Sequence, residues 1–321
     1  MDRVNRNPGQ KFDGSELDWL LDEYLNAKAN KVAAPTLKDY GIALGYFRKW
    51  WNEIGPSQGH VVNRNDFHKF LRWLEVQPSR QGERLGLGTV DTVMKRLKQF
   101  FHWSWSNEYF KRNYSEWIPR PTGEVAKREA PDPEKLELLF IAAGQMEKPI
   151  RNRAILAILI GTAVRRTECV NIDIEHVRFT ADGKGEIAIV SGKGKKPRTV
   201  IFDAIAGDYI ATHIRYMQDA GYTSGPLFLG RRGRLGAKGL YVVIKACAEK
   251  AGLSDQIQGP HDLRRLFATY WSRKQRGEGY TKPLSLQMGH TGERMTLHYS
   301  KQDISDVRAT FTSPMEMLTK K

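Results

Sequence analysis

The sequence predicts a mainly α-helical protein with a small β-sheet, divided into two domains. Its 321 residues exceed the roughly 150 residues of a typical single domain. Apolar residues recur at intervals of three and four over most of the chain, which is the spacing of helices that pack on a core. Only residues 186–190 and 199–202 are rich in β-forming residues. Their closeness in sequence predicts a hairpin or a three-stranded sheet.

The first domain is predicted to be a helical bundle over residues 15–118, preceded by a polar segment, residues 1–14, that we expect to be flexible. Four apolar stripes with helical spacing predict four helices, enough for a compact bundle. The second helix is expected to follow Pro35, and Thr89 is a candidate N-terminal cap of the fourth. The stripes are Leu17, Leu20, Leu21, Tyr24 and Leu25; Leu37, Tyr40, Leu44, Phe47 and Trp51; Phe67, Phe70, Leu71 and Leu74; and Val90, Val93, Met94, Leu97, Phe101 and Trp105.

A second domain, of α+β type, is predicted over residues 132–300. It follows residues 119–131, where three prolines and a glycine predict a linker. Asp132, Pro133 and Glu134 have the residue order of a helix start, with a cap, a proline and an acidic first turn. The further helices are expected at residues 150–162, 205–219, 237–251, 261–274, 283–289 and 294–299.

The chain is strongly basic, with a formal net charge of +15 at pH 7. A folded protein of this charge typically binds a polyanion, most often nucleic acid; a ribosome-associated protein or a merely basic enzyme is the alternative.

Cys169 and Cys247 are the only cysteines, which excludes a four-thiolate zinc site. No stretch approaches the ~18 apolar residues of a membrane helix, and residues 1–14 lack the apolar core of a signal peptide. We therefore expect a soluble, cytoplasmic protein.

Two groups in the first half of the second domain are candidates for phosphate chemistry. Glu168 lies three positions after Arg165, close enough on a helix to hold its guanidinium in one orientation for a phosphate. Lys193 lies in the turn between the two β-rich segments, where an amine could give a proton to a leaving oxygen. Each also has an ordinary structural explanation, a surface ion pair and a basic turn.

Two further groups follow near the C-terminus. His261 and Arg264 are three positions apart at a predicted helix start, so an imidazole that handles protons and a fixed cation lie on one face. His290 follows a glycine, and Tyr299 follows nine positions later. A tyrosine hydroxyl has a pKa near 10, so it needs cations or a proton acceptor beside it before it attacks anything at neutral pH. Taken alone, such a tyrosine is usually a packing residue.

In combination these residues resemble the tyrosine recombinase, or phage integrase, family. Residues 163–168 resemble its first arginine box and residues 192–194 its hairpin lysine. Residues 261–269 resemble its second box, and residues 289–299 its third. The similarity covers about residues 130–300 and implies an integrase-type catalytic domain. The N-terminal bundle fits the family's SAM-like, core-binding domain in size, helix content and position.

This sequence departs from the family pattern at three positions near the site. Ala163 stands where glycine is usual, Met288 replaces the usual leucine, and Arg265 stands where histidine is frequent. None of these changes removes a catalytic group.

The resemblance implies that Tyr299 attacks a DNA phosphorus, forms a 3′-phosphotyrosyl link and releases the 5′-hydroxyl. It assigns Arg165, Arg264 and His290 to the non-bridging oxygens, on which negative charge grows. The link conserves the energy of the phosphodiester, so ATP is not required. No metal and no cofactor is expected, since the arginines do the work of a metal.

Three residues have supporting roles in this scheme. Lys193 would protonate the departing 5′ oxygen, with Lys195 and Lys196 as alternatives. His261 would accept or relay the tyrosine proton. Glu168 would orient its arginine without contacting DNA.

The partner implied by the resemblance is double-stranded DNA with inverted core sites. Stepwise exchange on two duplexes requires four protomers and a four-way junction, so we expect a monomer in solution and a tetramer on DNA. Accessory DNA-bending or directionality factors are compatible partners, and the short segment before the first helix leads us to expect no separate arm-site domain. The residues expected to contact DNA are Lys38, Arg48, Lys95, Lys195, Lys196, Arg198, Arg231, Arg232 and Arg265.

The tail, residues 301–321, has an amphipathic pattern that includes Ile304, Val307, Phe311 and Met315. We expect it to dock on a neighbouring protomer, with packing on its own domain as the alternative.

Three other functions compete with recombination. A type IB topoisomerase or hairpin resolvase shares the same attack, a catalytically silent DNA-binding regulator shares the charge, and a metal-dependent nuclease is disfavoured by the absence of an acidic cluster.

Overall fold

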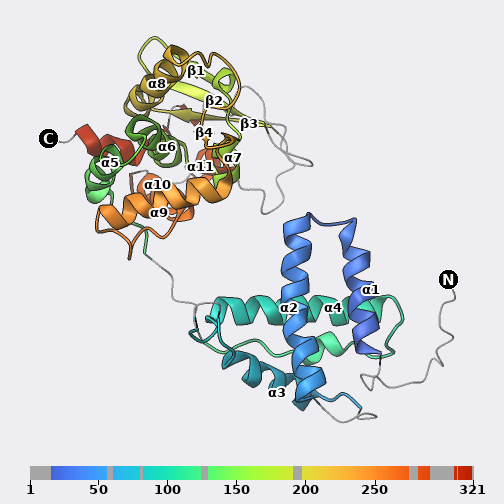
Figure 1. Cartoon of the computed structure of the whole chain (residues 1–321). Helices are drawn as coiled ribbons and strands as arrows, with labels where there is room; N and C mark the ends of the chain where they lie inside the picture. The colour runs from blue at the N-terminus through green and yellow to red at the C-terminus, as the bar shows by residue number, and fades with distance from the viewer. Residues whose placement is uncertain are drawn as a thin grey trace. The chain divides into compact units, whose positions relative to one another are not determined.

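The structure is a computed structural model of the whole chain (Figure 1). It describes residues 16–55, 61–79, 82–123, 129–190, 197–274, 281–289, 307–308 and 310–319. The chain divides into two compact units between Lys127 and Arg128, inside the segment that the sequence predicts as the linker. Both units are mainly helical and only the second contains strands, among the described residues. The predicted fold class is confirmed.

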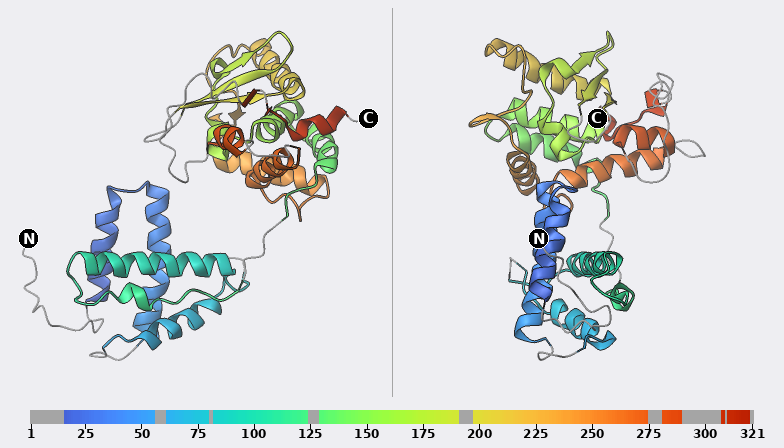
Figure 2. Two further views of the ribbon diagram at one scale, coloured as in Figure 1. Left: turned by 180° about the vertical axis from the view of Figure 1, so that it is seen from behind. Right: turned by 90° about the vertical axis from the view of Figure 1, so that its right-hand side faces the viewer.

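The N-terminal unit is a helical bundle, as predicted. Helix α4 packs across α1 and α2, and α3 packs on α2 and α4 (Figure 2). Aromatic rings fill the core: Phe47 lies between Phe67, Phe70 and Phe101, with ring centroids 5.0–6.5 Å apart. The helices are α1 (Leu17–Ala29), α2 (Ala34–Glu53), α3 (Arg64–Glu75) and α4 (Leu87–Ser106), followed by the 3-10 helix η1 (Tyr114–Trp117).

The prediction that Thr89 caps α4 is wrong. The helix begins at Leu87, and Gly86 occupies the cap position with extended backbone. The backbone N–H of Thr89 donates to the carbonyl of Gly86 at 2.8 Å, which places Thr89 in the first turn. Glycine is an accepted cap residue, and the prediction failed because it favoured a side-chain hydroxyl over it.

The C-terminal unit is built around one buried helix, α6, which contacts α5, α8 and α10 (Figure 1). Every residue from Ile155 to Ile160 is fully buried. The predicted start at Asp132 is confirmed, because its side chain accepts from the backbone N–H of Glu134 at 3.0 Å. The elements are η2 (Pro133–Lys135), α5 (Leu136–Gly144), α6 (Pro149–Thr162), α7 (Arg166–Val170), η3 (Ile174–His176), α8 (Ala204–Asp219), α9 (Ala237–Lys250), α10 (Pro260–Lys274), α11 (Thr281–Met288) and η4 (Pro314–Thr319).

A three-stranded antiparallel sheet, in the order β1-β2-β3, covers part of this helix core. Strands β2 and β3 pair from Gly185 opposite Phe202 to Ile189 opposite Arg198, so the two segments predicted as β-rich pair with each other; residues 191–196 between them lie outside the described residues. A second, two-stranded ribbon lies further along the chain. The strands are β1 (Val177–Phe179), β2 (Gly185–Ile189), β3 (Arg198–Phe202), β4 (Leu229–Gly230) and β5 (Gly233–Arg234).

The described part of the C-terminal tail packs on its own unit. Helix η4 contacts α5, α6, α8 and α10, and Met315 is fully buried. Val307 and Phe311 join an apolar cluster with Phe267 and Trp271. The sequence favoured docking on a neighbour; the packing seen is the alternative, within one protomer. Ile304 and the predicted helix at 294–299 lie outside the described residues.

None of the helices in the described ranges combines the length and the hydropathy needed to cross a membrane.

Candidate active site

Arg165 lies where the buried helix α6 ends. The helix stops because Ala163 has a left-handed backbone, with φ 54°, a conformation that costs a non-glycine residue roughly 1–2 kcal/mol. The turn returns Val164 to the core and makes Arg165 the residue before α7. The positive φ gives a physical reason for the glycine that the family usually carries at position 163.

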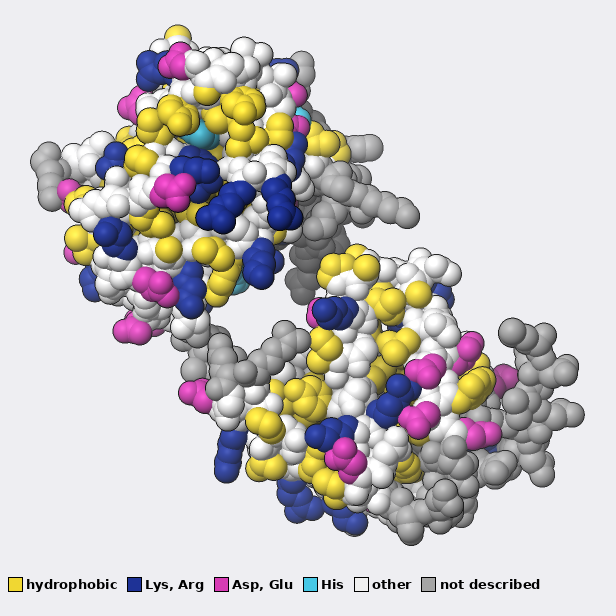
Figure 3. Space-filling model, viewed as in Figure 1, with side chains coloured by type: hydrophobic (Ala, Val, Ile, Leu, Met, Phe, Trp, Pro, Cys, Tyr) yellow, Lys and Arg dark blue, Asp and Glu magenta, His cyan; other side chains and the backbone are white. Residues whose placement is uncertain are grey.

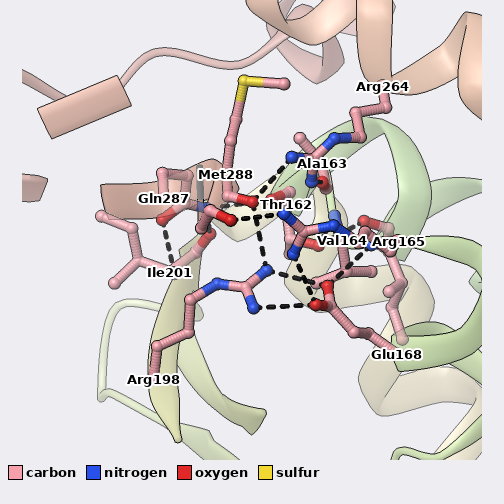
Figure 4. Close-up of polar contacts among 12 residues, drawn as sticks. Thr162, Ala163, Val164, Arg165, Glu168, Arg198, Ile201, Arg264, Gln287 and Met288 are labelled. Carbon is pink, nitrogen blue, oxygen red and sulfur yellow. Dashed lines mark hydrogen bonds and ion pairs between the residues drawn. The ribbon is translucent and has the colours of Figure 1, made fainter. Parts of the chain in front are cut away.

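Glu168 is the carboxylate on which two arginines converge (Figure 4). Its oxygens accept from the backbone N–H and from Nη1 of Arg165, both at 2.8 Å. They also accept from Nη1 and Nη2 of Arg198, at 2.9 and 2.8 Å. The predicted contact between Glu168 and Arg165 is therefore present, and the second arginine is an addition that the sequence did not indicate.

Hydrogen bonds keep Glu168 ionised although it is mostly buried. Burial raises the pKa of this carboxyl, but the hydrogen bonds and positive charge of Arg198 and Arg165 outweigh that effect and lower the pKa to about 2. Glu168 is therefore a fixed anion at neutral pH. A carboxylate that accepts four hydrogen bonds has little freedom to rotate, so it holds both guanidinium groups in place.

Arg264 lies on α10 and is almost fully buried. Its Nη2 donates to the carbonyl of Met288 at 2.7 Å, and its Nη1 donates to the carbonyl of Ala163. Burial, together with repulsion from Arg165, lowers the pKa of Arg264 to about 10. The guanidinium thus stays protonated at neutral pH and links the turn at Ala163 to the end of α11.

The C-terminal end of α11 is where these cations meet. Nη2 of Arg165 donates to the carbonyl of Gly289, while Arg264 and Arg198 approach the carbonyl of Met288, at 2.7 and 3.5 Å. Positive charge at this end of a helix is favourable, because the last carbonyls and the helix dipole are negative there. The next residue in the chain is His290.

A buried amide fixes α11 on the rest of the unit. Gln287 is 1% exposed. Its Nε2 donates to the carbonyls of Ile201 and Thr162, at 2.8 and 3.3 Å, and its Oε1 accepts from the backbone N–H of Ile201 at 3.2 Å. One side chain thus joins α11, β3 and the end of α6, and sequence reasoning did not single it out.

Other residues of the second box lie in the first two turns of α10. His261 is exposed, and Asp262 beside it is buried and accepts from the backbone N–H groups of Gln258 and Gly259 at 2.7 and 3.2 Å. Arg265 forms an ion pair with Asp262 at 3.0 Å. Asp262 therefore holds the turn that presents His261, and it restrains Arg265.

Among the predicted site residues, the structure brings together Arg165, Glu168 and Arg264, which come from two separate segments, the start of α7 and helix α10. Lys193, Lys195, Lys196, His290 and Tyr299 lie outside the described residues.

Arg198 was predicted to contact a DNA phosphate, whereas the structure places it on Glu168 inside this cluster. The two residues are 30 positions apart, so no local spacing in the sequence indicates the contact. A signal lies only in the fold: Arg198 opens β3, and β3 runs beside α6 and α11.

The arrangement is suited to an anion with several oxygens. Two guanidinium groups contact one carboxylate, and a third, that of Arg264, interacts with it electrostatically, which leaves an excess of positive charge. The contacts described use one hydrogen of each terminal nitrogen of Arg165, so this side chain, 31% exposed, keeps donors for a ligand. Within the described ranges, no group of three or more His, Cys, Asp or Glu side chains is placed to hold a metal ion.

Comparison with known sequences agrees with this chemistry. Residues 132–305, more than half of the chain, match the phage integrase family. A tyrosine recombinase XerC of Anoxybacillus flavithermus (strain DSM 21510 / WK1) is 28% identical over 266 residues, which cover 78% of this chain and 82% of that protein. XerC of Escherichia coli O1:K1 / APEC is 25% identical over 242 residues, covering 75% and 78%.

Solved structures share the fold. The XerH site-specific recombinase bound to a palindromic difH substrate, in a post-cleavage complex, matches with a TM-score of 0.63 at 19% identity, covering 89% of this chain and 84% of that one. The lambda integrase tetramer bound to a Holliday junction matches with a TM-score of 0.64 at 16% identity, covering 93% and 82%. The chain therefore belongs to the phage integrase family and is a tyrosine site-specific recombinase.

Proposed function

We propose that this recombinase cleaves and rejoins DNA through a 3′-phosphotyrosyl link formed by Tyr299. The observation that carries the proposal is the convergence of Arg165 and Arg264 on the backbone directly before His290. Two fixed cations at this point would stabilise the charge that grows on the phosphate oxygens during attack, and donors held in place in advance typically contribute a few kcal/mol each.

The remaining steps are proton transfers. His261, exposed at the start of α10, would accept or relay the proton of Tyr299. Lys193 would protonate the 5′ oxygen as it leaves. Glu168 contacts no DNA in this scheme and acts by holding Arg165. The reverse attack by a 5′-hydroxyl reseals the strand, because the phosphotyrosyl link keeps the energy of the broken bond.

We further propose that four protomers act on two duplexes with inverted core sites, in the cytoplasm of a prokaryotic host. Support comes from the relatives: the lambda integrase that matches this fold is a tetramer bound to a Holliday junction, and the matching XerH is bound to a palindromic substrate. A free monomer that assembles on DNA fits this scheme.

The DNA-contacting surface is proposed to include the exposed turn between β4 and β5, with Arg231 and Arg232. Figure 3 shows Lys and Arg side chains gathered on the face of the C-terminal unit that it presents. In the N-terminal unit Lys38 is exposed, while Arg48 and Lys95 form surface ion pairs with Asp22 and Asp91, at 2.6 and 2.5 Å. Such pairs are weak, so a phosphate can compete for both side chains.

The test uses duplexes nicked beside the cleavage site, which trap the enzyme because the cleaved end diffuses away. In EDTA, the wild-type protein should become covalently attached to the 3′ end, and Tyr299→Phe should not. Tyr222→Phe, a change at an exposed tyrosine, is the matched control and should form the adduct normally.

Three outcomes would contradict the proposal. No adduct on any DNA would assign the chain to binding without catalysis. An adduct that requires a divalent cation would assign metal-dependent cleavage. Strand nicking and resealing without any exchange between duplexes would assign topoisomerase-type chemistry.

A further inference from the structure

Arg198 is a charged side chain that the proposed chemistry does not use. It is the first residue of β3, and its side chain is only 15% exposed. Its terminal nitrogens donate to both oxygens of Glu168, and Nη2 also lies 3.5 Å from the carbonyl of Met288. One guanidinium therefore joins three segments that are distant in sequence: α7, β3 and the end of α11 (Figure 4).

The backbone at Gly289 leaves room for this guanidinium. A Cβ added at position 289 would lie 2.7 Å from Cζ and from Nε of Arg198, and 2.9 Å from Nη1. At those distances the guanidinium of Arg198 would have to move to admit a side chain, and the φ of +62° at Gly289 also favours glycine. Arg198 thus rests against the backbone from which the chain continues to His290.

These contacts leave Arg198 poorly placed to hold a DNA phosphate. Both terminal nitrogens donate to Glu168, and Nε is buried with no hydrogen-bond partner in the described part of the chain. A buried guanidinium with an unpaired donor carries a free-energy cost. A phosphate contact needs donors that face solvent, as those of the exposed Arg231 and Arg232 do.

We propose that Arg198 is a positioning residue of the recombination site, which holds Glu168, and through it Arg165, against the end of α11. Lys193 precedes Arg198 by five positions, and His290 follows Met288 by two. The contact between Arg198 and the end of α11 therefore lies close in sequence to two further residues of the proposed reaction. The inference rests on the proposed function, since it assigns Arg165, Lys193 and His290 to the reaction.

The charges around Glu168 predict how the site responds when Arg198 is removed. Glu168 faces Arg165 and Arg198 directly, and Arg264 and the buried thiol of Cys169 interact with it electrostatically. Burial raises the pKa of Glu168, and the hydrogen bond from Arg198 is the largest opposing effect. Without Arg198, Glu168 should take up a proton more readily and release Arg165.

The experiment measures adduct formation in a single turnover on a nicked duplex at saturating DNA. Arg198→Ala should slow it about 10- to 100-fold, the range typical of residues that orient a reacting group. DNA affinity should change by less than about threefold, and its salt dependence should not change. Arg215→Ala, at an exposed arginine of α8, removes the same charge far from the cluster and should behave as wild type.

A pH profile separates positioning from a purely structural role. In Arg198→Ala, the fall of the rate with decreasing pH should begin at a higher pH than the titration of Glu168 causes in the wild type, because without Arg198 the carboxyl of Glu168 takes up a proton more readily. Combining the change with Glu168→Gln should remove the acid fall and add little to the loss of rate, because both changes break the same contact. Arg198→Lys, which keeps the charge but cannot span both oxygens, guards against misfolding of the alanine variant and should also be slow.

Two results would overturn the inference. The first is that Arg198→Ala keeps the wild-type rate at saturating DNA but binds DNA more weakly, with its slope of log affinity against log salt reduced by about one. Arg198 would then be a phosphate contact. Full activity of Arg198→Lys would show that charge alone is needed. The Tyr299→Phe arm keeps the two proposals separate: an adduct that survives that change contradicts the proposed function, whereas a fast Arg198→Ala contradicts only the role of Arg198.

Discussion

Glu168 shows how one side chain organises several cations. It accepts hydrogen bonds from Arg165 and Arg198 with the geometry of charge-assisted pairs. Both arginines are partly removed from water, and the anion beside them lowers the cost of burying their charge. The carboxylate therefore stabilises the fold and prepares the site at the same time.

The pH dependence of stability tests this role. The pKa of Glu168 is lowered from 4.5 to about 2 in the folded protein, so its contribution is fully present above about pH 4.5 and is lost as pH falls towards 2. At neutral pH the contribution is roughly 3 kcal/mol, since a tenfold change in protonation corresponds to about 1.4 kcal/mol. In urea unfolding, the difference between wild type and Glu168→Gln should shrink by about half or more from pH 7 to pH 3. A difference that is constant across this range would contradict the contact.

Removing Arg264 tests the catalytic side of the cluster. Arg264→Ala should slow cleavage by about 100-fold or more, as loss of one fixed donor typically does. It should also destabilise the unit, because the carbonyls of Ala163 and Met288 lose a donor. The measurement is the single-turnover rate at a temperature where circular dichroism shows the variant folded. A folded variant with the wild-type rate would exclude Arg264 from the reaction.

At the level of single residues, the sequence predicts part of the site. The contact of Glu168 with Arg165 follows from a spacing of three residues, which local helical geometry brings together. The contact with Arg198 depends on how β3 packs beside α6 and α11, and a single sequence contains no spacing that encodes it. The position of Arg198 after a basic turn led the sequence prediction to a DNA phosphate, whereas the structure places its side chain on Glu168.

At the scale of elements, the site depends on how α11 is attached. Gln287 makes three hydrogen bonds to the backbone of Ile201 and Thr162, and it does so in a region that excludes water. An amide can satisfy a donor and an acceptor at once, which a charged or apolar residue of the same size could not. The orientation of Met288 and Gly289 towards the arginines follows from this attachment.

Gln287→Leu should therefore lower the free energy of unfolding by about 2–3 kcal/mol, because buried backbone groups lose their partners. Cleavage should slow as well, since α11 then loses its fixed position. Gln218→Ala, at an exposed residue of α8, is the control and should change stability by less than about 0.5 kcal/mol. Denaturant unfolding compares the two. If Gln287→Leu unfolds with the same free energy as Gln218→Ala, Gln287 does not hold α11.

Most elements follow from apolar spacing. The periodic stripes of residues 17–105 predict the four helices of the bundle, because each stripe must be buried against the others. The start of α4 was misplaced because a glycine cap carries no side-chain signal. The position of the tail could not be predicted either, since an amphipathic segment packs equally well on its own domain or on a neighbour.

Packing of the tail within one protomer makes a specific prediction. Met315→Ala should cost about 2–4 kcal/mol, the usual range for a fully buried methionine. Met317→Ala, at a partly exposed position of the same helix, should cost less than about 1 kcal/mol. The unfolding midpoint should not depend on protein concentration. A midpoint that rises with concentration would mean that the tail is exchanged between protomers.

For the molecule as a whole, net positive charge determines how strongly the protein is attracted to DNA. The net charge of +15 exceeds what the catalytic cluster requires, so much of it is available for phosphates on the outer surface. A deletion of residues 303–321 would remove Val307, Phe311 and Met315, which belong to the core of the same unit. Such a deletion cannot distinguish exchange of the tail between protomers from loss of stability. Surface charges offer a cleaner test of how the whole protein binds DNA.

Changing Arg231 and Arg232 together to Ala should weaken DNA binding and lower the slope of log affinity against log salt by about two, one for each phosphate contact. The cleavage rate at saturating DNA should fall much less than the affinity. A matched change of Arg273 and Lys274, two exposed residues at the end of α10, serves as the comparison. An unchanged slope in the first variant would place the DNA elsewhere.

The proposed reaction requires Tyr299 to lie within reach of the cations that Arg165 and Arg264 supply. The most direct measurement is mass spectrometry of the covalent adduct after protease and nuclease digestion, which identifies the residue that carries the nucleotide. We expect the nucleotide on the peptide that contains Tyr299, and much less of this peptide from Arg264→Ala at the same reaction time. A nucleotide attached to any other residue would contradict the account.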